Sequence, residues 1–216
     1  MMTSEVSDIA LMTNQFGVSK GAEEKNSAAI VHFVERAKAG DSVAFEQLIN
    51  CYQRKVVSIA WRILGNQEDA RDAAQETFLK AYKYLKSFKA EQDFSGWLYQ
   101  ITVNACRDIA RKRGAAGQFT SFEVEQELGS FEKLASPNNV EALAIAAQEK
   151  ALIAQAIQSL SKKERAAIVL RDLEGLPTEE VARILGSSQT TVRSQISSAR
   201  AKIKSFHERM LKHVKR

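Results

Sequence analysis

The spacing of glycine and proline limits most strongly what this chain can fold into. Its 216 residues include two prolines and ten glycines, and glycine is absent from 41–64, 66–95, 130–174 and 187–216. These stretches are rich in Ala, Leu, Glu, Lys, Gln and Arg, which favour helices, and none shows the alternation of apolar and polar residues typical of strands. The sequence therefore predicts an all-α fold.

Capping residues and apolar spacing place helices in the first half of the chain. After Asp41, a good N-cap, apolar residues keep helical spacing until Gly65, which is a typical stop. Further helices are expected from about Asn66 to about Lys86 and over 94–113, with a loop between them. The last of these helices ends in a strongly basic run.

The second half of the chain has the pattern of a helix-turn-helix. A capping box of Ser161 and Glu164 predicts a helix that runs to about Leu173. A short helix follows, then the break 186–188, and another helix from about Gln189. Helices joined by a short turn that contains glycine are typical of DNA-binding proteins, in which the second helix enters the major groove.

Charge divides the chain into four segments. The net charge is −2 over 1–27, +4 over 28–114, −3 over 115–139 and +6 over 140–216, giving +5 in total. We interpret 1–27 as a mobile tail and 115–139 as a flexible acidic linker between two basic helical domains. A basic balance favours an anionic partner such as nucleic acid.

Composition also limits the functional classes. The longest apolar run has six residues, at 142–147, so no transmembrane segment is predicted, and the first ten residues lack the basic start of a secretory signal. The protein is therefore expected in the cytoplasm. Cys51 and Cys106 are far apart and give neither a disulfide framework nor a CxxC metal site. The three histidines have no ligand spacing, so no enzyme, metal or cofactor is expected.

Two helix faces are candidates for binding. On the helix from Gln189, Val192 and Ile196 share an apolar face, while small hydroxyl residues lie opposite it between Arg193 and Arg200. Such a surface allows close approach to base edges, although a solvated basic helix is the alternative. On the expected helix 66–86, a charged stripe lies opposite the apolar face, either as an ordinary solvated face or as a docking surface for a partner helix.

Three strings, DARDAAQETFLKAY, FSGWLYQITVNACRDIARKR and TEEVARILGSSQTTVRSQISSARAKI, resemble the extracytoplasmic-function sigma factors of bacterial RNA polymerase. The resemblance covers about 28–212. It implies a non-enzymatic alternative sigma factor that binds core polymerase and initiates transcription at specific promoters. It also implies that an anti-sigma factor holds the protein in check. By the resemblance, 28–114 is region 2, which binds core and recognises and melts the minus-ten element, and 140–216 is region 4, which reads the minus-thirty-five element.

The resemblance also assigns site residues position by position. The residues assigned to core polymerase are Asp69, Asp72, Gln75, Glu76, Leu79 and Lys80. Those assigned to minus-ten DNA, duplex or melted, are Lys86, Phe88, Lys89, Asn104, Arg107, Asp108, Arg111, Lys112 and Arg113. Those assigned to minus-thirty-five DNA are Ser188, Gln189, Thr190, Thr191, Arg193, Ser194, Ser197, Arg200 and Lys204.

The chain departs from the family pattern at a few positions. Arg71 replaces a usual acid, and Gln195 and Ser198 replace usual basic residues, so core and phosphate contacts there are expected to differ. Trp97 has the spacing of a core residue, with base stacking as the alternative.

A different class of function is a helix-turn-helix regulator that is not a polymerase subunit, which would bind duplex DNA through 161–212 and dimerise through its N-terminal helices. This alternative leaves the charged stripe and the NACRDIARKR string without a role.

Overall fold

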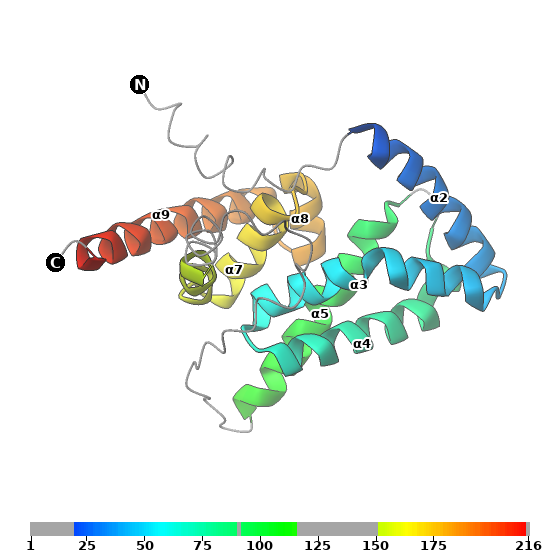
Figure 1. The fold of residues 1–216 in the computed structure, drawn as a ribbon, viewed down its shortest axis with the longest axis horizontal. Helices are drawn as coiled ribbons and strands as arrows, with labels where there is room; N and C mark the ends of the chain where they lie inside the picture. Colours follow the sequence, from blue (N-terminus) through cyan, green and yellow to red (C-terminus); the bar gives the residue numbers. More distant parts are fainter. Residues whose placement is uncertain (1–19, 90–91, 116–150, 215–216) are drawn as a thin grey trace, which may run out of the picture.

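The structure is a computed structural model that describes residues 20–89, 92–115 and 151–214 (Figure 1). Within these ranges all regular secondary structure is helical, which confirms the predicted all-α fold. None of the helices described there has an apolar stretch long enough to cross a membrane. Most of the expected linker, 116–139, lies outside the described residues.

The N-terminal half is a bundle of α2 (Lys20–Lys38), α3 (Ser42–Leu64), α4 (Gln67–Tyr84) and α5 (Phe94–Ala115), with the 3-10 turn η2 (Leu85–Ser87) after α4. Helix α3 packs against each of the other three helices, and α4 packs against α5. The fully buried core residues of this half include Leu48, Val56, Leu85 and Leu98. Burying such a side chain contributes about 1.5–3 kcal/mol, so the bundle is held mainly by this apolar core.

Local capping fixes where α3 and α4 begin. The Asp41 carboxylate accepts hydrogen bonds from the amides of Val43 and Ala44 at 3.0 and 3.1 Å, and the Asn66 side chain accepts one from Asp69 at 2.9 Å. Gly65 ends α3 at φ 73°, a left-handed conformation that glycine adopts without steric cost. The predicted N-cap Asp41 and the predicted stop at Gly65 are confirmed, and the next helix begins near Asn66 as expected.

The C-terminal half contains α7 (Lys162–Ile168), the π-helical segment η4 (Val169–Leu173), α8 (Thr178–Leu185) and α9 (Gln189–Val214). The α7 capping box is present as predicted. Gly186 ends α8 at φ 63°, and α9 starts after a short turn, so the predicted helix-turn-helix is confirmed. Both α7 and α8 pack against α9.

Three boundaries differ from the sequence-based expectations. Helix α2 begins at Lys20, inside the segment expected as a tail. Helix α4 ends at Tyr84 and tightens into the 3-10 turn η2, a common helix ending. The helix expected to continue to Leu173 widens after Ile168, where the Glu174 amide bonds the Val169 carbonyl five residues back.

The two halves are packed against each other. A single buried cluster joins Ile59, Tyr99 and Val103 of the N-terminal half with C-terminal residues such as Leu170 and Val181. Helix α5 contacts α8, and α3 contacts α7 and η4. Figure 1 shows α7 and α8 beside the ends of α3 and α5, with α9 extending away.

Candidate protein and nucleic-acid interfaces

The charged stripe of α4 is largely solvent-exposed. Asp72, Gln75, Glu76 and Leu79 are all exposed, and Leu79 keeps 60% of its accessible surface. Asp69 is different, because it is buried and pairs with Arg113 at 2.7 Å. Burial raises the pKa of Asp69 although this guanidinium opposes the effect. The stripe thus offers a polar surface with one large exposed apolar side chain.

Lys80 links the stripe to α5. Its ammonium lies 3.2 Å from Glu76 and 3.5 Å from Asp108, and the hydrogen bond to Glu76 is the main cause that raises the Lys80 pKa. Asp108 also pairs with Arg111 at 3.1 Å. Residues predicted for polymerase and residues predicted for DNA therefore share one ion-pair network.

An open apolar groove of about 350 Å³ lies beside the stripe. The groove is lined by Phe45, Ile49, Gln75, Phe78, Leu79 and Tyr82. Exposed apolar surface of this kind, rimmed by charges, is typical of protein interaction sites. Sequence reasoning named Gln75 and Leu79 but missed Tyr82, which follows Leu79 by one helical turn and is 57% exposed.

In the segment before α5, the lysines are exposed and the phenylalanine is buried. Lys86 and Lys89 are exposed, whereas Phe88 keeps only 5% of its surface. The Phe88 ring packs against Phe94 and Trp97, with centroids 5.6 and 5.0 Å apart. This burial gives no support to the assignment of Phe88 to minus-ten DNA. Trp97 is half-buried in the same cluster, as its spacing predicts.

One face of α5 carries an exposed polar row. Arg107 donates a hydrogen bond to Asn104 at 3.3 Å, and both side chains are exposed. Arg111 and Lys112 are exposed further along the helix. Exposed cationic side chains of this kind can contact phosphates, whereas Arg113 pairs with Asp69.

The face of α9 that is predicted to contact DNA is exposed to solvent. Ser188 caps the helix, since its hydroxyl accepts a hydrogen bond from the Thr191 amide at 3.1 Å. Arg193 lies beside Gln189, to whose side-chain oxygen it donates at 3.1 Å. The other predicted residues that are exposed on this helix are Thr190, Ser194, Ser197 and Lys204. An exposed set of hydroxyls and a guanidinium suits groove contacts.

Arg200 is committed to an internal ion pair. Its guanidinium donates two hydrogen bonds to the Asp172 carboxylate, at 2.8 and 2.7 Å. Asp172 lies in η4, so this pair fixes α9 against the preceding turn. The bidentate geometry uses the donors that a base contact would need, so the placement favours a structural role for Arg200.

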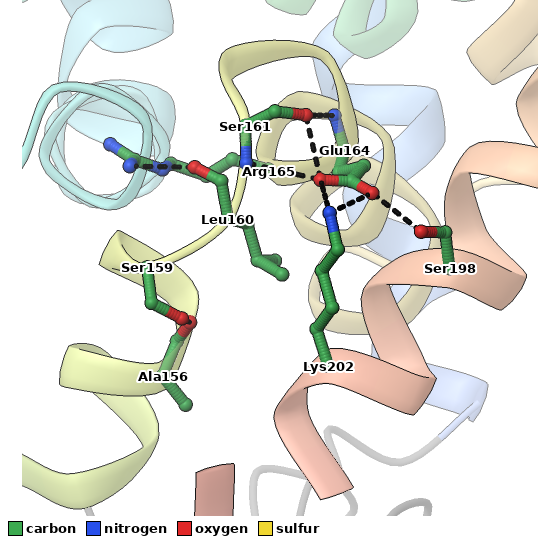
Figure 2. Close-up of polar contacts among 8 residues, drawn as sticks. All are labelled: Ala156, Ser159, Leu160, Ser161, Glu164, Arg165, Ser198 and Lys202. Atoms are coloured by element: carbon green, nitrogen blue, oxygen red, sulfur yellow. Dashed lines mark hydrogen bonds and ion pairs between the residues drawn. The ribbon is translucent and has the colours of Figure 1, made fainter. Parts of the chain in front are cut away.

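Ser198 and Gln195, the departures from the family pattern on α9, face the rest of the domain. Ser198 donates to the Glu164 carboxylate at 2.6 Å, and Lys202 donates to the same carboxylate at 2.7 and 2.9 Å. The Gln195 side-chain oxygen is buried. Figure 2 shows Ser198 and Lys202 pointing from α9 toward Glu164 and the start of α7. Ser198 and Lys202 therefore hold α9 against the start of α7, whereas the Gln195 oxygen has no hydrogen-bond partner among the described residues.

The contacts of Glu164 lead us to expect that acid destabilises the C-terminal half. Hydrogen bonds from Lys202, Ser198 and Ser161 lower its pKa from 4.5 to about 2. A lowered folded-state pKa stabilises the fold above pH 4.5, and this stabilisation is lost as pH falls from there to about 2. Because Lys202 is half-exposed, we expect Glu164→Gln to lower the free energy of unfolding by only about 2 kcal/mol at neutral pH and by less in acid. Urea unfolding at several pH values, compared with Glu208→Gln, measures this; equal pH dependence of variant and parent would contradict it.

Family models match both halves of the chain. The model described as sigma-70 region 2 matches residues 48–116, and that described as sigma-70 region 4 matches 150–203. The "ECF RNA polymerase sigma-E factor" of Salmonella typhimurium is 36% identical over 175 residues, covering 79% of this chain and 90% of the relative. This chain belongs to the extracytoplasmic-function sigma factors. The "RNA polymerase sigma-H factor" of Pseudomonas aeruginosa is 33% identical over 172 residues, covering 79% and 89%.

Two solved structures have a similar fold. CnrH, solved in complex with the cytosolic domain of CnrY, has a TM-score of 0.61 at 24% identity, covering 83% of this sigma factor and 97% of that chain. RpoE of Bartonella quintana, solved with the anti-sigma factor NepR, has a TM-score of 0.60 at 24% identity, covering 76% and 96%. At this level of identity the likeness supports the fold.

Proposed function

We propose that this sigma factor binds core RNA polymerase through α4 and directs initiation at promoters through α5 and α9. The observation that carries the proposal is the exposed stripe of α4 beside an apolar groove, on the bundle that also presents the polar row of α5. A transcription regulator needs only a DNA-binding half, so it leaves this surface without a role. Residues 28–114 then act as region 2 and 140–216 as region 4.

The polymerase surface centres on four exposed residues. Asp72, Gln75, Glu76 and Leu79 supply charge and one apolar anchor, while Lys80 holds the stripe against α5. Asp69 contributes indirectly, because its pair with Arg113 fixes the start of α4 to the end of α5. A partner helix with basic residues around one apolar side chain fits this surface.

The promoter surfaces follow from the exposed residues of α5 and α9. On the minus-ten side, Lys86, Lys89, Asn104, Arg107, Asp108, Arg111 and Lys112 face solvent fully or partly. Base flipping costs a few kcal/mol, which contacts to the freed strand must offset. On the minus-thirty-five side, α9 presents the exposed residues described above. Its DNA contacts then depend on hydroxyls and Arg193 more than on Arg200.

An anti-sigma factor completes the proposal. The family includes proteins held by such partners, and an inhibitor of this kind would cover the α4 stripe or the promoter faces. The protein acts where the polymerase acts, in the cytoplasm, and as a specificity factor without catalytic residues of its own.

Run-off transcription tests the proposal. Purified core polymerase is assayed with and without this protein on a library of bacterial promoter fragments at a stated salt concentration, because salt changes DNA affinity steeply. New start sites that require the protein are expected. Absence of core binding and of initiation, with specific duplex binding still present, would instead establish the regulator.

Arg193→Ala tests base readout. The guanidinium is exposed and oriented by Gln189, so its loss is expected to weaken minus-thirty-five binding by about 1–3 kcal/mol if it contacts a base. Holoenzyme binding to promoters substituted at single positions measures this. The expected loss is confined to one base pair; an equal loss on every sequence would make Arg193 a phosphate contact.

A further inference from the structure

We infer that Tyr84, at the end of α4, is a stacking platform for a base of single-stranded DNA. The inference rests on the proposed function, in which that DNA is the melted promoter strand beside α5. Tyr84 is not among the residues that the family resemblance assigns to DNA. Three features carry the inference: the exposure of the ring, the cations that flank it, and its place relative to the polar row of α5.

The Tyr84 side chain is exposed on a well-anchored turn. Tyr84 keeps 49% of its accessible surface where α4 passes into the 3-10 turn η2. The residues Leu85 and Phe88, which follow it, keep only 2% and 5% of their surface. The Ser87 hydroxyl donates a hydrogen bond to the Tyr84 carbonyl at 2.7 Å. A base that stacks on Tyr84 therefore meets a ring whose backbone is already ordered.

Positive charge flanks the exposed ring. The Lys83 ammonium lies 5.4 Å from the centroid of the Tyr84 ring, which is a cation–π contact. Lys86 and Lys89 are exposed further along the chain. Proteins bind single strands with this combination, because aromatic rings stack on bases while cations contact the phosphates. The chemistry therefore favours a polyanion with accessible bases, such as a melted strand.

Two ion pairs place Tyr84 near the polar row of α5. Arg113 pairs with Asp69 at 2.7 Å and Asp108 with Lys80 at 3.5 Å, so α4 and α5 run in opposite directions. Tyr84 lies one helical turn beyond Lys80.

The same arrangement places Asn104, an exposed member of the row, one turn before Asp108 on α5. Because the helices are antiparallel, Tyr84 and Asn104 lie toward the same end of the contact between Lys80 and Asp108. A strand that follows the polar row past Asn104 is therefore led toward Tyr84.

Tyr84 is separate from the apolar groove on α4. Tyr82 lines that groove and Tyr84 does not. Residues two positions apart in a helix point about 200° apart, so the two tyrosines project to opposite sides of α4. Phe88 and Phe94, the neighbouring rings of the aromatic cluster, are buried. Tyr84 is therefore the accessible ring on the side of α4 that carries Lys80.

Fluorescence of 2-aminopurine tests the stacking, because a stacked 2-aminopurine is quenched. The full chain is titrated against a short oligothymidine strand that carries one 2-aminopurine at its centre. Tyr84→Phe keeps the ring and should keep both the affinity and the quenching. Tyr84→Leu keeps an apolar side chain without the ring, and it should bind about tenfold or more weakly with reduced quenching.

Salt dependence separates stacking from phosphate contacts. Tyr84→Leu should lower the affinity without changing the slope of log K against log salt. Lys86→Ala removes a cation and should reduce that slope by about 0.7. Val43→Ala is the control, since Val43 is 59% exposed at the start of α3, and it should leave the affinity, the quenching and the slope unchanged. Circular dichroism should show equal helix content in all variants.

The outcomes distinguish this inference from the proposed function. Equal affinity and quenching for Tyr84→Leu and the parent, or no strand binding by the parent, would overturn the inference. Initiation in the run-off assay together with such a result would leave the proposed function in place. Strand binding that depends on the Tyr84 ring, without any initiation by the parent, would overturn the proposed function and leave the stacking contact intact.

Discussion

Reversing the charges of Asp72 and Glu76 is expected to abolish association with core polymerase. Both carboxylates are exposed on α4 beside the apolar groove, so the double change to lysine presents like charge to a basic partner. Like-charge contacts across an interface cost several kcal/mol, which corresponds to at least about a hundredfold weaker binding. Competition against a labelled sigma factor for core polymerase measures this.

The control for the charge reversal is an equal change elsewhere. Glu179 and Glu208 are exposed in the C-terminal half, and their replacement by lysine should leave core association nearly unchanged. Helix content is not expected to differ between the two double variants, because none of the four side chains is buried. Undiminished binding by the Asp72 and Glu76 variant would remove α4 from the interface.

Phe88→Ala is expected to destabilise the N-terminal bundle by about 3–5 kcal/mol. The side chain is buried between Phe94 and Trp97, so truncation removes these contacts and leaves a cavity. Urea unfolding followed by tryptophan fluorescence measures the loss, since Trp97 lies against the altered site. Phe88→Leu, which keeps most of the volume, should cost much less.

The same variant distinguishes a core role from a DNA role. If Phe88 stacked on a base, the alanine variant would keep its stability and lose affinity for the melted strand. We expect instead that Phe88→Ala lowers the stability of the bundle. Lys89→Ala, at an exposed neighbour, should weaken strand binding without changing stability.

Sequence alone was enough for most of the helices and for the helix ends that capping residues set. Asp41, Gly65 and the Ser161 capping box act within one turn, so their effect depends on neighbours in the chain. The exposed stripe of α4 and the recognition face of α9 follow from helical periodicity, which is equally local. The family resemblance likewise depends on linear strings, and the comparisons confirm it.

Tertiary structure decided which side chains remain free to bind. DNA contacts require the residue types of Arg200, Arg113 and Phe88. In the structure, however, Arg200 pairs with Asp172, Arg113 pairs with Asp69, and Phe88 packs into an aromatic cluster. The sequence likewise gives no sign of the packing of the two halves, in which Glu174 pairs with Arg62 of α3. These contacts join residues that are distant in the chain or lie on different helices, and only packing brings such partners together. The sequence thus determined the helices and their exposed faces, while the packing of those helices decided which side chains on them are available.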